Sequence, residues 1–203
     1  MKKLTIDYRL IIGLVMVHVF MYSSFHKTSI FWYMFTATML LLMSYSIINE
    51  KMEHETSFLT YSMYGIISGI LLYSLFWVGH FFIDVLDLPF QKEVTKLYKL
   101  YSPTKIWQYV VLFCFIVPGE ELFWRGFVQN RLSKFMNNPY SILIGAILYA
   151  SVQIYSGTFI HIFSALFAGL FWGFLYSWKK SIPLVVVSHL IFDLFIFIAF
   201  PFR

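Results

Sequence analysis

Long apolar runs follow one another along the whole chain and restrict its fold more than any other feature. A helix needs about 20 consecutive, mostly apolar residues to cross a bilayer. Hydrophobic residues make up 60% of the 203 positions and charged residues only 12%, which is more apolar surface than a soluble domain of this length needs. Polar and apolar residues do not alternate, as they would in the strands of a membrane barrel. The sequence therefore predicts an all-α, polytopic membrane protein.

The apolar runs predict a bundle of about seven transmembrane helices in a multi-pass protein of the cell membrane, with the lipid bilayer around it. The first run follows basic residues, as in a signal peptide, but FMYSSFHK lacks a small-residue cleavage site, so we count the run as a span. The predicted spans are Leu10–Ser24, Ser29–Ile48, Phe58–Leu86, Ile106–Asn130, Pro139–Tyr155, Phe159–Trp178 and Ile182–Phe200.

One connection, residues 87–105, is long enough to hold structure of its own. Val94 and Leu97 alternate there with Lys92, Lys96 and Lys99, which is typical of an amphipathic helix on the membrane surface. A solvated loop is the alternative that the residues leave open. The other connections are too short for a domain, so we expect the function to lie within the membrane, with no nucleic acid as a partner.

The stretch PGEELFWRGF, residues 118–127, places three charges inside the fourth predicted span. Each charge at the bilayer centre costs about 2.5–3.5 kcal/mol, so all three need partners. Glu121 and Arg125 are four residues apart, on one helical face, where they can form an ion pair. Glu120 is rotated by about 100° from Glu121 and lacks this partner, so it could act as a general base. Alternatively, both acids belong to a packing network around Arg125.

The stretch SHLIFD places His189 and Asp193 four residues apart in the last predicted span. This spacing suits either a pair of metal ligands or a histidine with its orienting carboxylate, and a satisfied core histidine is the alternative. At about 1.5 Å per residue, Glu120 lies about 16 Å from its membrane boundary, His189 about 12 Å and Asp193 about 18 Å. These similar depths predict an intramembrane polar site in which the residues meet.

These two motifs resemble those of a known family of intramembrane metalloproteases. EELFWR and HLIFD are similar to the glutamate-glutamate-x-x-x-arginine and histidine-x-x-x-asparagine/aspartate motifs of the CAAX protease and bacteriocin-processing family, also called Abi, which includes type II CAAX prenyl endopeptidases. The resemblance covers roughly residues 105–200, including the turn KKSIP. It implies two parts: N-terminal transmembrane helices with the amphipathic connection, 1–104, and a catalytic-type helical core, 105–203.

A third family motif, phenylalanine-x-x-x-histidine, is altered in this chain. YASVQ stands in its place, with Tyr149 for the phenylalanine and Gln153 for the histidine, at a depth of about 21 Å that agrees with the other polar residues. A glutamine can hydrogen-bond water but cannot take up its proton. The resemblance therefore implies a weakened or inactive member, unless another group compensates, for which His161 is the nearest candidate.

The family resemblance also implies a role for each motif residue. Glu120 would activate a water molecule for attack on a peptide carbonyl, and Arg125 would hold Glu121. His189 and Asp193 would bind the oxyanion or a metal ion.

The candidate cofactor is Zn²⁺, with Glu120 and His189 as its ligands. A three-ligand zinc site is harder to build here, because Gln153 replaces an imidazole.

Two classes of function remain open at this stage. The first is an endopeptidase that cleaves a membrane-associated or prenylated peptide or protein. The second is a non-catalytic membrane protein on the same scaffold, for example in bacteriocin self-immunity or as a regulatory partner.

Two small-x-x-x-small patterns, at Gly65 with Gly69 and at Gly169 with Gly173, predict close helix packing within the bundle. Contacts between copies in a homo-oligomer are the alternative.

Overall fold

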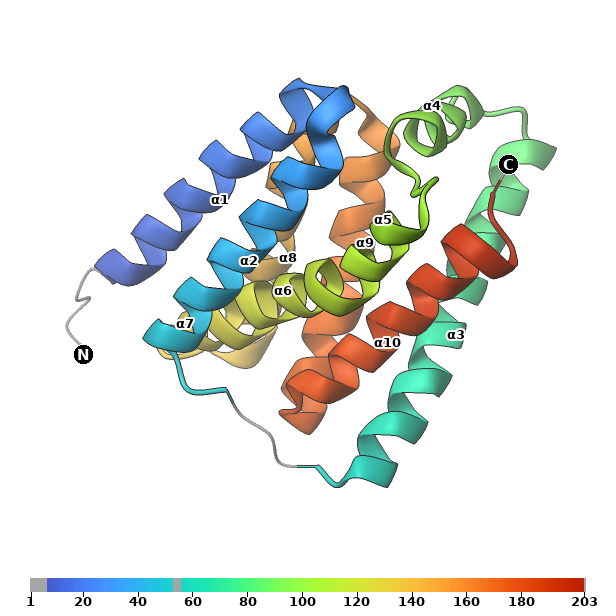
Figure 1. The fold of residues 1–203 in the computed structure, drawn as a ribbon. Coiled ribbons are helices and arrows are strands. Elements are labelled where there is room, and N and C mark those ends of the chain that lie inside the picture. The colour runs from blue at the N-terminus through green and yellow to red at the C-terminus, as the bar shows by residue number, and fades with distance from the viewer. Residues whose placement is uncertain (1–6, 53–55, 203) are drawn as a thin grey trace.

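The computed structural model describes residues 7–52 and 56–202, and the chain within these ranges is almost entirely helical (Figure 1). Within the described residues, seven helices are long and apolar enough to cross a membrane, which confirms the predicted polytopic bundle. Each of their ends lies within two residues of the predicted end. They are Tyr8–His26, Thr28–Asn49, Phe58–Val85, Ile106–Leu132, Asn138–Ser156, Phe159–Lys179 and Ile182–Ala199.

The described residues form ten α-helices, of which all but α4 belong to the spans, and tighter or wider helical turns join them in places. The α-helices are α1 (Tyr8–His26), α2 (Phe31–Asn49), α3 (Phe58–Val85), α4 (Gln91–Tyr101), α5 (Ile106–Val111), α6 (Val117–Glu121), α7 (Asn130–Leu132), α8 (Asn138–Ser151), α9 (Phe159–Lys179) and α10 (Ile182–Leu194). Turns of 3₁₀ helix cover Thr28–Ile30 and Val152–Ser156, and π-helix covers Leu112–Ile116, Leu122–Gln129 and Phe195–Ala199.

The fourth span, which carries the two glutamates, is the least regular. Its short α6 contains Pro118 and lies between the π-helical stretches Leu112–Ile116 and Leu122–Gln129. Proline cannot donate the backbone hydrogen bond of a regular helix, and π-helical turns in proteins are often found at functional sites. The span is therefore π-helical on both sides of the short α-helix that ends with Glu120 and Glu121.

Helices α3 and α10 pack closely along the small residues of α3. A side-chain carbon on Gly65 would lie 2.7 Å from Val187, and one on Gly69 would lie 2.5 Å from the main-chain oxygen of Ser188. In the same way, a carbon on Gly169 would lie 3.1 Å from the backbone of Ala146 in α8. The glycine patterns thus serve packing inside the bundle, as predicted, and a homo-oligomer stays a prediction.

A cluster of charges joins the ends of three spans. Arg131, at the end of the fourth span, contacts Asp7 with Nη1 at 2.7 Å and Glu50 with Nε at 3.1 Å. Burial raises the pKa of Asp7, but hydrogen bonds from Arg131 and from the Leu10 amide, together with the Arg131 charge, outweigh it and hold this pKa below its ordinary value. The cluster therefore fixes α1 and α2 to the fourth span at one end of the bundle.

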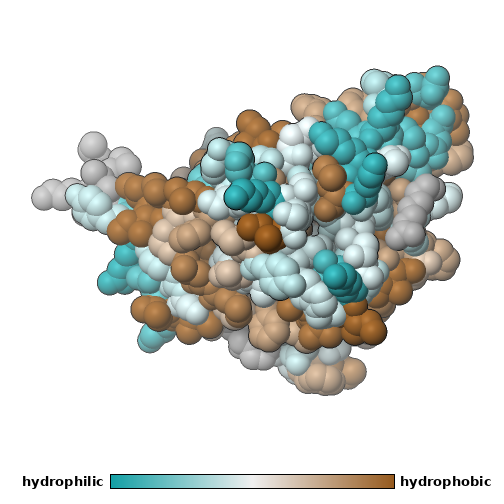
Figure 2. Space-filling model, turned by 45° about the horizontal axis from the view of Figure 1, so that its top comes forward, coloured by the Kyte–Doolittle hydropathy of each residue, from teal (hydrophilic) through white to brown (hydrophobic). Residues whose placement is uncertain are grey.

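The connection 87–105 contains the predicted amphipathic helix, α4, and the loop alternative is wrong over Gln91–Tyr101. Its apolar side faces the bundle, where Val94 is buried. Glu93 Oε2 accepts a hydrogen bond from the Ile160 amide at 2.7 Å, and Tyr98 donates one to the main-chain oxygen of Ile196 at 2.8 Å. Hydrophilic side chains gather at this end of the molecule, whereas apolar side chains cover much of the remaining visible face (Figure 2).

Candidate active site

The predicted site residues come from three separate parts of the chain and all lie inside the bundle. Glu120 and Glu121 end α6, Arg125 follows in the π-helical turn, and Gln153 lies in the 3₁₀ turn after α8. His189 and Asp193 lie in α10. All six side chains are buried: Glu120, Glu121, Arg125, Gln153, His189 and Asp193.

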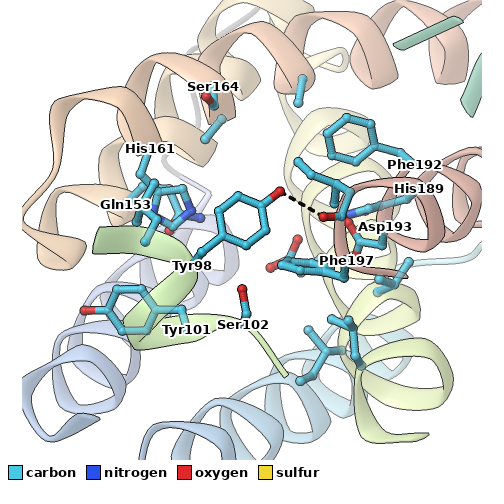
Figure 3. Close-up of a pocket in the computed structure, with 18 of the residues that line it drawn as sticks. Tyr98, Tyr101, Ser102, Gln153, His161, Ser164, His189, Phe192, Asp193 and Phe197 are labelled. Atoms are coloured by element: carbon cyan, nitrogen blue, oxygen red, sulfur yellow. Dashed lines mark hydrogen bonds and ion pairs between the residues drawn. The ribbon is translucent and has the colours of Figure 1, made fainter. Parts of the chain in front are cut away.

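A cavity of about 250 Å³ brings four of the six residues together, lined by Glu120, Gln153, His189 and Asp193 among others. Most of its remaining wall is aromatic or aliphatic, and α4 closes part of it with Leu97, Tyr98 and Tyr101 (Figure 3). Glu121 and Arg125 are not among the lining residues. The site thus has a group that faces the cavity and a group that lies behind its wall.

The group behind the wall centres on Glu121. Arg125 Nη1 lies 3.1 Å from both carboxylate oxygens of Glu121, so the predicted ion pair between positions four apart is present. The same carboxylate contacts His189 Nδ1 at 2.7 Å, a contact between distant spans that the sequence does not indicate. An ionised carboxylate only accepts hydrogen bonds, so His189 donates from Nδ1. Glu121 therefore fixes the orientation of the imidazole ring.

With Nδ1 engaged, His189 presents Nε2 towards Asp193. The distance from Nε2 to Asp193 Oδ1 is 3.7 Å, which is within ion-pair range but too long for a hydrogen bond. Trp172 stacks on the imidazole, with ring centroids 3.9 Å apart and an interplanar angle of 26°. Its indole N–H donates to Ser188 Oγ at 3.2 Å. The ring of His189 is thus held by a hydrogen bond at one edge and by Trp172 across its face.

Glu120 has a partner that the sequence analysis did not assign. The Tyr149 hydroxyl donates a hydrogen bond to Glu120 Oε2 at 3.1 Å. The ring of Tyr149 also lies 4.9 Å from the Arg125 guanidinium carbon, and that of Trp172 lies 5.3 Å from it. Two aromatic residues therefore complete the site. The sequence could have indicated Tyr149, because a tyrosine with its hydroxyl stands there in place of the phenylalanine of the family motif. Nothing in the sequence distinguishes Trp172 from the other residues of its apolar run.

The described residues do not fit a three-ligand zinc centre. Catalytic zinc sites use three protein ligands and one open position. Within residues 7–52 and 56–202, no group of three or more histidine, cysteine, aspartate or glutamate side chains is placed to hold a metal ion. Binding of Zn²⁺ by Glu120 and His189 therefore stays a prediction.

The fold and the site define a class of protein: a multi-pass helical membrane protein with a buried glutamate, histidine and aspartate around one cavity within the bundle. Residues 102–195 match the family model of the type II CAAX prenyl endopeptidase Rce1-like proteins. This segment is just under half of the chain, contains all six predicted site residues and confirms the resemblance found in the motifs. Comparisons with curated proteins and with solved structures gave no match.

Proposed function

We propose that the protein is an endopeptidase of the cell membrane that hydrolyses a peptide bond in a membrane-associated or prenylated peptide, with a water molecule activated by Glu120. The observation that carries this proposal is that Glu120, His189 and Asp193 line one cavity within membrane-spanning helices. The match of residues 102–195 to a family named for CAAX prenyl endopeptidases supports the same reaction class.

In the proposed reaction, Glu120 takes a proton from water as the water oxygen attacks the carbonyl carbon of the peptide bond. Tyr149 occupies one oxygen of Glu120, which leaves the other for the water. The carbonyl oxygen becomes an oxyanion, which a protonated His189 stabilises through its Nε2–H while Nδ1–H stays on Glu121. Glu120 then returns the proton to the leaving amine as the C–N bond breaks.

Zinc would supply Lewis-acid polarisation of the carbonyl if Glu120 and His189 bound it. No step above depends on the metal, so its role is open to direct measurement.

The proposal is tested with a library of quenched-fluorescence peptides, with and without a prenyl group and with added zinc or chelator. We expect cleavage by the wild-type protein that Glu120→Gln abolishes. The Gln153→His variant restores an imidazole and should raise the rate by about 10²- to 10⁴-fold, the contribution of a positioned acid–base group. Loss of this gain in the Glu120→Gln, Gln153→His double variant would show that the carboxylate is the base.

Gln153 also favours the second candidate, a non-catalytic membrane protein for self-immunity or regulation, because its side chain cannot take up a proton at neutral pH. Absence of cleavage by the wild type and by Gln153→His, together with a cellular phenotype that survives Glu120→Gln, would establish this alternative.

A further inference from the structure

Gln153 has an unsatisfied polar atom in the cavity. Its side chain is only 4% exposed, and Oε1 accepts no hydrogen bond from the residues that the structure describes. The Nδ1 atom of His161, which lines the same cavity, is also buried without a hydrogen-bond partner among them. A buried polar atom without a partner is destabilising, so such atoms in native proteins usually indicate a ligand or a water molecule.

The local fold holds the two side chains at one side of the cavity. The 3₁₀ turn that carries Gln153 ends at Gly157, whose positive φ of 68° reverses the chain before α9 begins at Phe159. The Ser156 hydroxyl fixes this reversal by donating to the main-chain oxygen of Gln153 at 2.8 Å. In Figure 3, Gln153 and His161 lie on the opposite side of the cavity from His189 and Asp193, with Tyr98 between the two groups.

The composition of the cavity indicates which ligand these atoms suit. Most of its wall is apolar, so a peptide chain inside would find few partners for its own N–H and C=O groups. The described part of the bundle contains no β-strand whose edge could pair with an extended peptide. A glutamine side chain offers one acceptor and two donors, which match the hydrogen-bonding groups of a peptide unit.

We propose that Gln153, with His161 beside it, binds a main-chain peptide group of the substrate and so places a peptide bond farther along the same segment against Glu120 and His189. The substrate class is a peptide segment that enters in extended form with apolar side chains against the aromatic wall. This inference rests on the proposed function, and it gives Gln153 a task in binding. The Gln153→His variant should therefore bind the peptide more weakly even where it cleaves bound peptide faster, since neutral imidazole offers one donor and one acceptor only.

The test is a double-mutant cycle between protein and peptide, measured as binding rather than cleavage. Full-length Glu120→Gln protein in nanodiscs would be titrated with fluorescent peptides that share a Phe-Ala-Val-Leu-Ala core. In each peptide, one amide is replaced by an ester or N-methylated. At one position we expect the change to weaken binding by about tenfold, as the loss of one hydrogen bond does. The same change should have no effect in protein that also carries Gln153→Met.

The test has two controls, a variant expected to have no effect and a second way to measure binding. Ile154→Val lies in the same 3₁₀ turn, at a residue that is 60% exposed and does not line the cavity, so it should leave the peptide scan unchanged. Titrations of the wild type with N-methylated peptides, which resist hydrolysis at the modified bond, repeat the measurement should Glu120→Gln fold poorly.

Equal weakening with and without Gln153→Met would overturn the inference and leave water as the partner of Gln153. Absence of saturable binding by any library peptide would overturn it as well. The two proposals can fail separately. Cleavage that depends on Glu120 without coupling to Gln153 preserves the enzyme and removes this subsite. Coupling without cleavage preserves a peptide-binding site and removes the enzyme.

Discussion

At the residue scale, the carboxylates of Glu120 and Glu121 are adjacent in sequence and serve different purposes. Glu121 is fully buried between Arg125 and His189, whereas Glu120 lines the cavity and contacts Tyr149. This division follows from helical geometry, because neighbouring positions point about 100° apart. The structure thus separates a carboxylate that orients other groups from a carboxylate that can meet a substrate.

Replacing Arg125 by alanine should destabilise the protein strongly. The change would remove the guanidinium from a buried ion pair and leave His189 as the remaining partner of the Glu121 carboxylate, and breaking a buried pair in this way costs about 3–5 kcal/mol. The measurement is thermal unfolding of the detergent-solubilised protein, together with its yield. Arg125→Lys keeps the positive charge and is the matched control. Its thermal stability should fall less than that of Arg125→Ala. Unchanged stability of Arg125→Ala would show that the ion pair is absent or solvated in the membrane.

Replacing Tyr149 by phenylalanine should remove the hydrogen bond to Glu120 while keeping the ring beside Arg125. Hydrogen bonds to charged groups contribute about 1.5–3 kcal/mol, so the free energy of unfolding should fall by this amount. Tyr33→Phe, at a 64% exposed side chain, provides the control and should change little. Equal changes in the free energy of unfolding for the two substitutions would show that the hydrogen bond from Tyr149 to Glu120 does not stabilise the protein.

At the scale of the helix, α4 is attached to the bundle by the hydrogen bonds of a few side chains. Glu93 binds the amide of Ile160 near the start of α9, and Lys96 reaches the main-chain oxygen of Gly157 at 3.3 Å. Its apolar residues cover part of the cavity that holds the site. Access to the cavity on this side therefore depends on how firmly α4 stays attached.

Glu93→Ala should increase hydrogen exchange in residues 91–101 while the seven spans keep their protection. The reason is that a carboxylate at a helix N-terminus is favourable both as an acceptor and through the helix dipole, and the variant lacks both contributions. Hydrogen exchange read by mass spectrometry measures the change. Lys92→Ala, on the same helix but without a hydrogen bond to the bundle among the described contacts, serves as the control. Similar exchange in both variants would contradict an anchoring role for Glu93.

At the scale of the whole molecule, the charge cluster around Arg131 should make stability depend on pH. The pKa of Asp7 is lowered in the folded state, so its contribution is present above the unfolded pKa of about 3.9 and is lost as the pH falls through the folded value. The wild type should therefore be more stable than Asp7→Asn near pH 6, and this difference should shrink on acidification below about pH 4. Unfolding of both proteins across this range measures the effect. A constant difference would mean that Asp7 does not titrate with folding.

The sequence predicted the spans, the local ion pair and a polar site shared by several spans, but not the individual contacts between the residues of that site. Runs of apolar residues identify helices because the bilayer sets their length, and the spacing of Glu121 and Arg125 follows from the helical period. The contact of Glu121 with His189 joins residues 68 positions apart, and that of Glu120 with Tyr149 joins residues 29 positions apart. The helical period predicts contacts only between residues a few positions apart, so it could not predict these two. The π-helical turns beside α6 also alter the facing of residues in a way that a regular helix does not predict.

The close fit of α3 on α10 has a consequence for the surrounding lipid. Helix α3 has 28 residues and rises about 42 Å, whereas the hydrocarbon layer is about 30 Å thick, so the helix must extend into the headgroup region, tilt, or reshape the bilayer near it. Gly69 lies against the main chain of Ser188, the residue before His189, and Ser68 donates a hydrogen bond to the Ser188 hydroxyl at 3.0 Å. A change in the tilt of α3 would therefore act on the backbone that carries His189, so we expect the shape of the cavity to depend on the thickness of the host membrane.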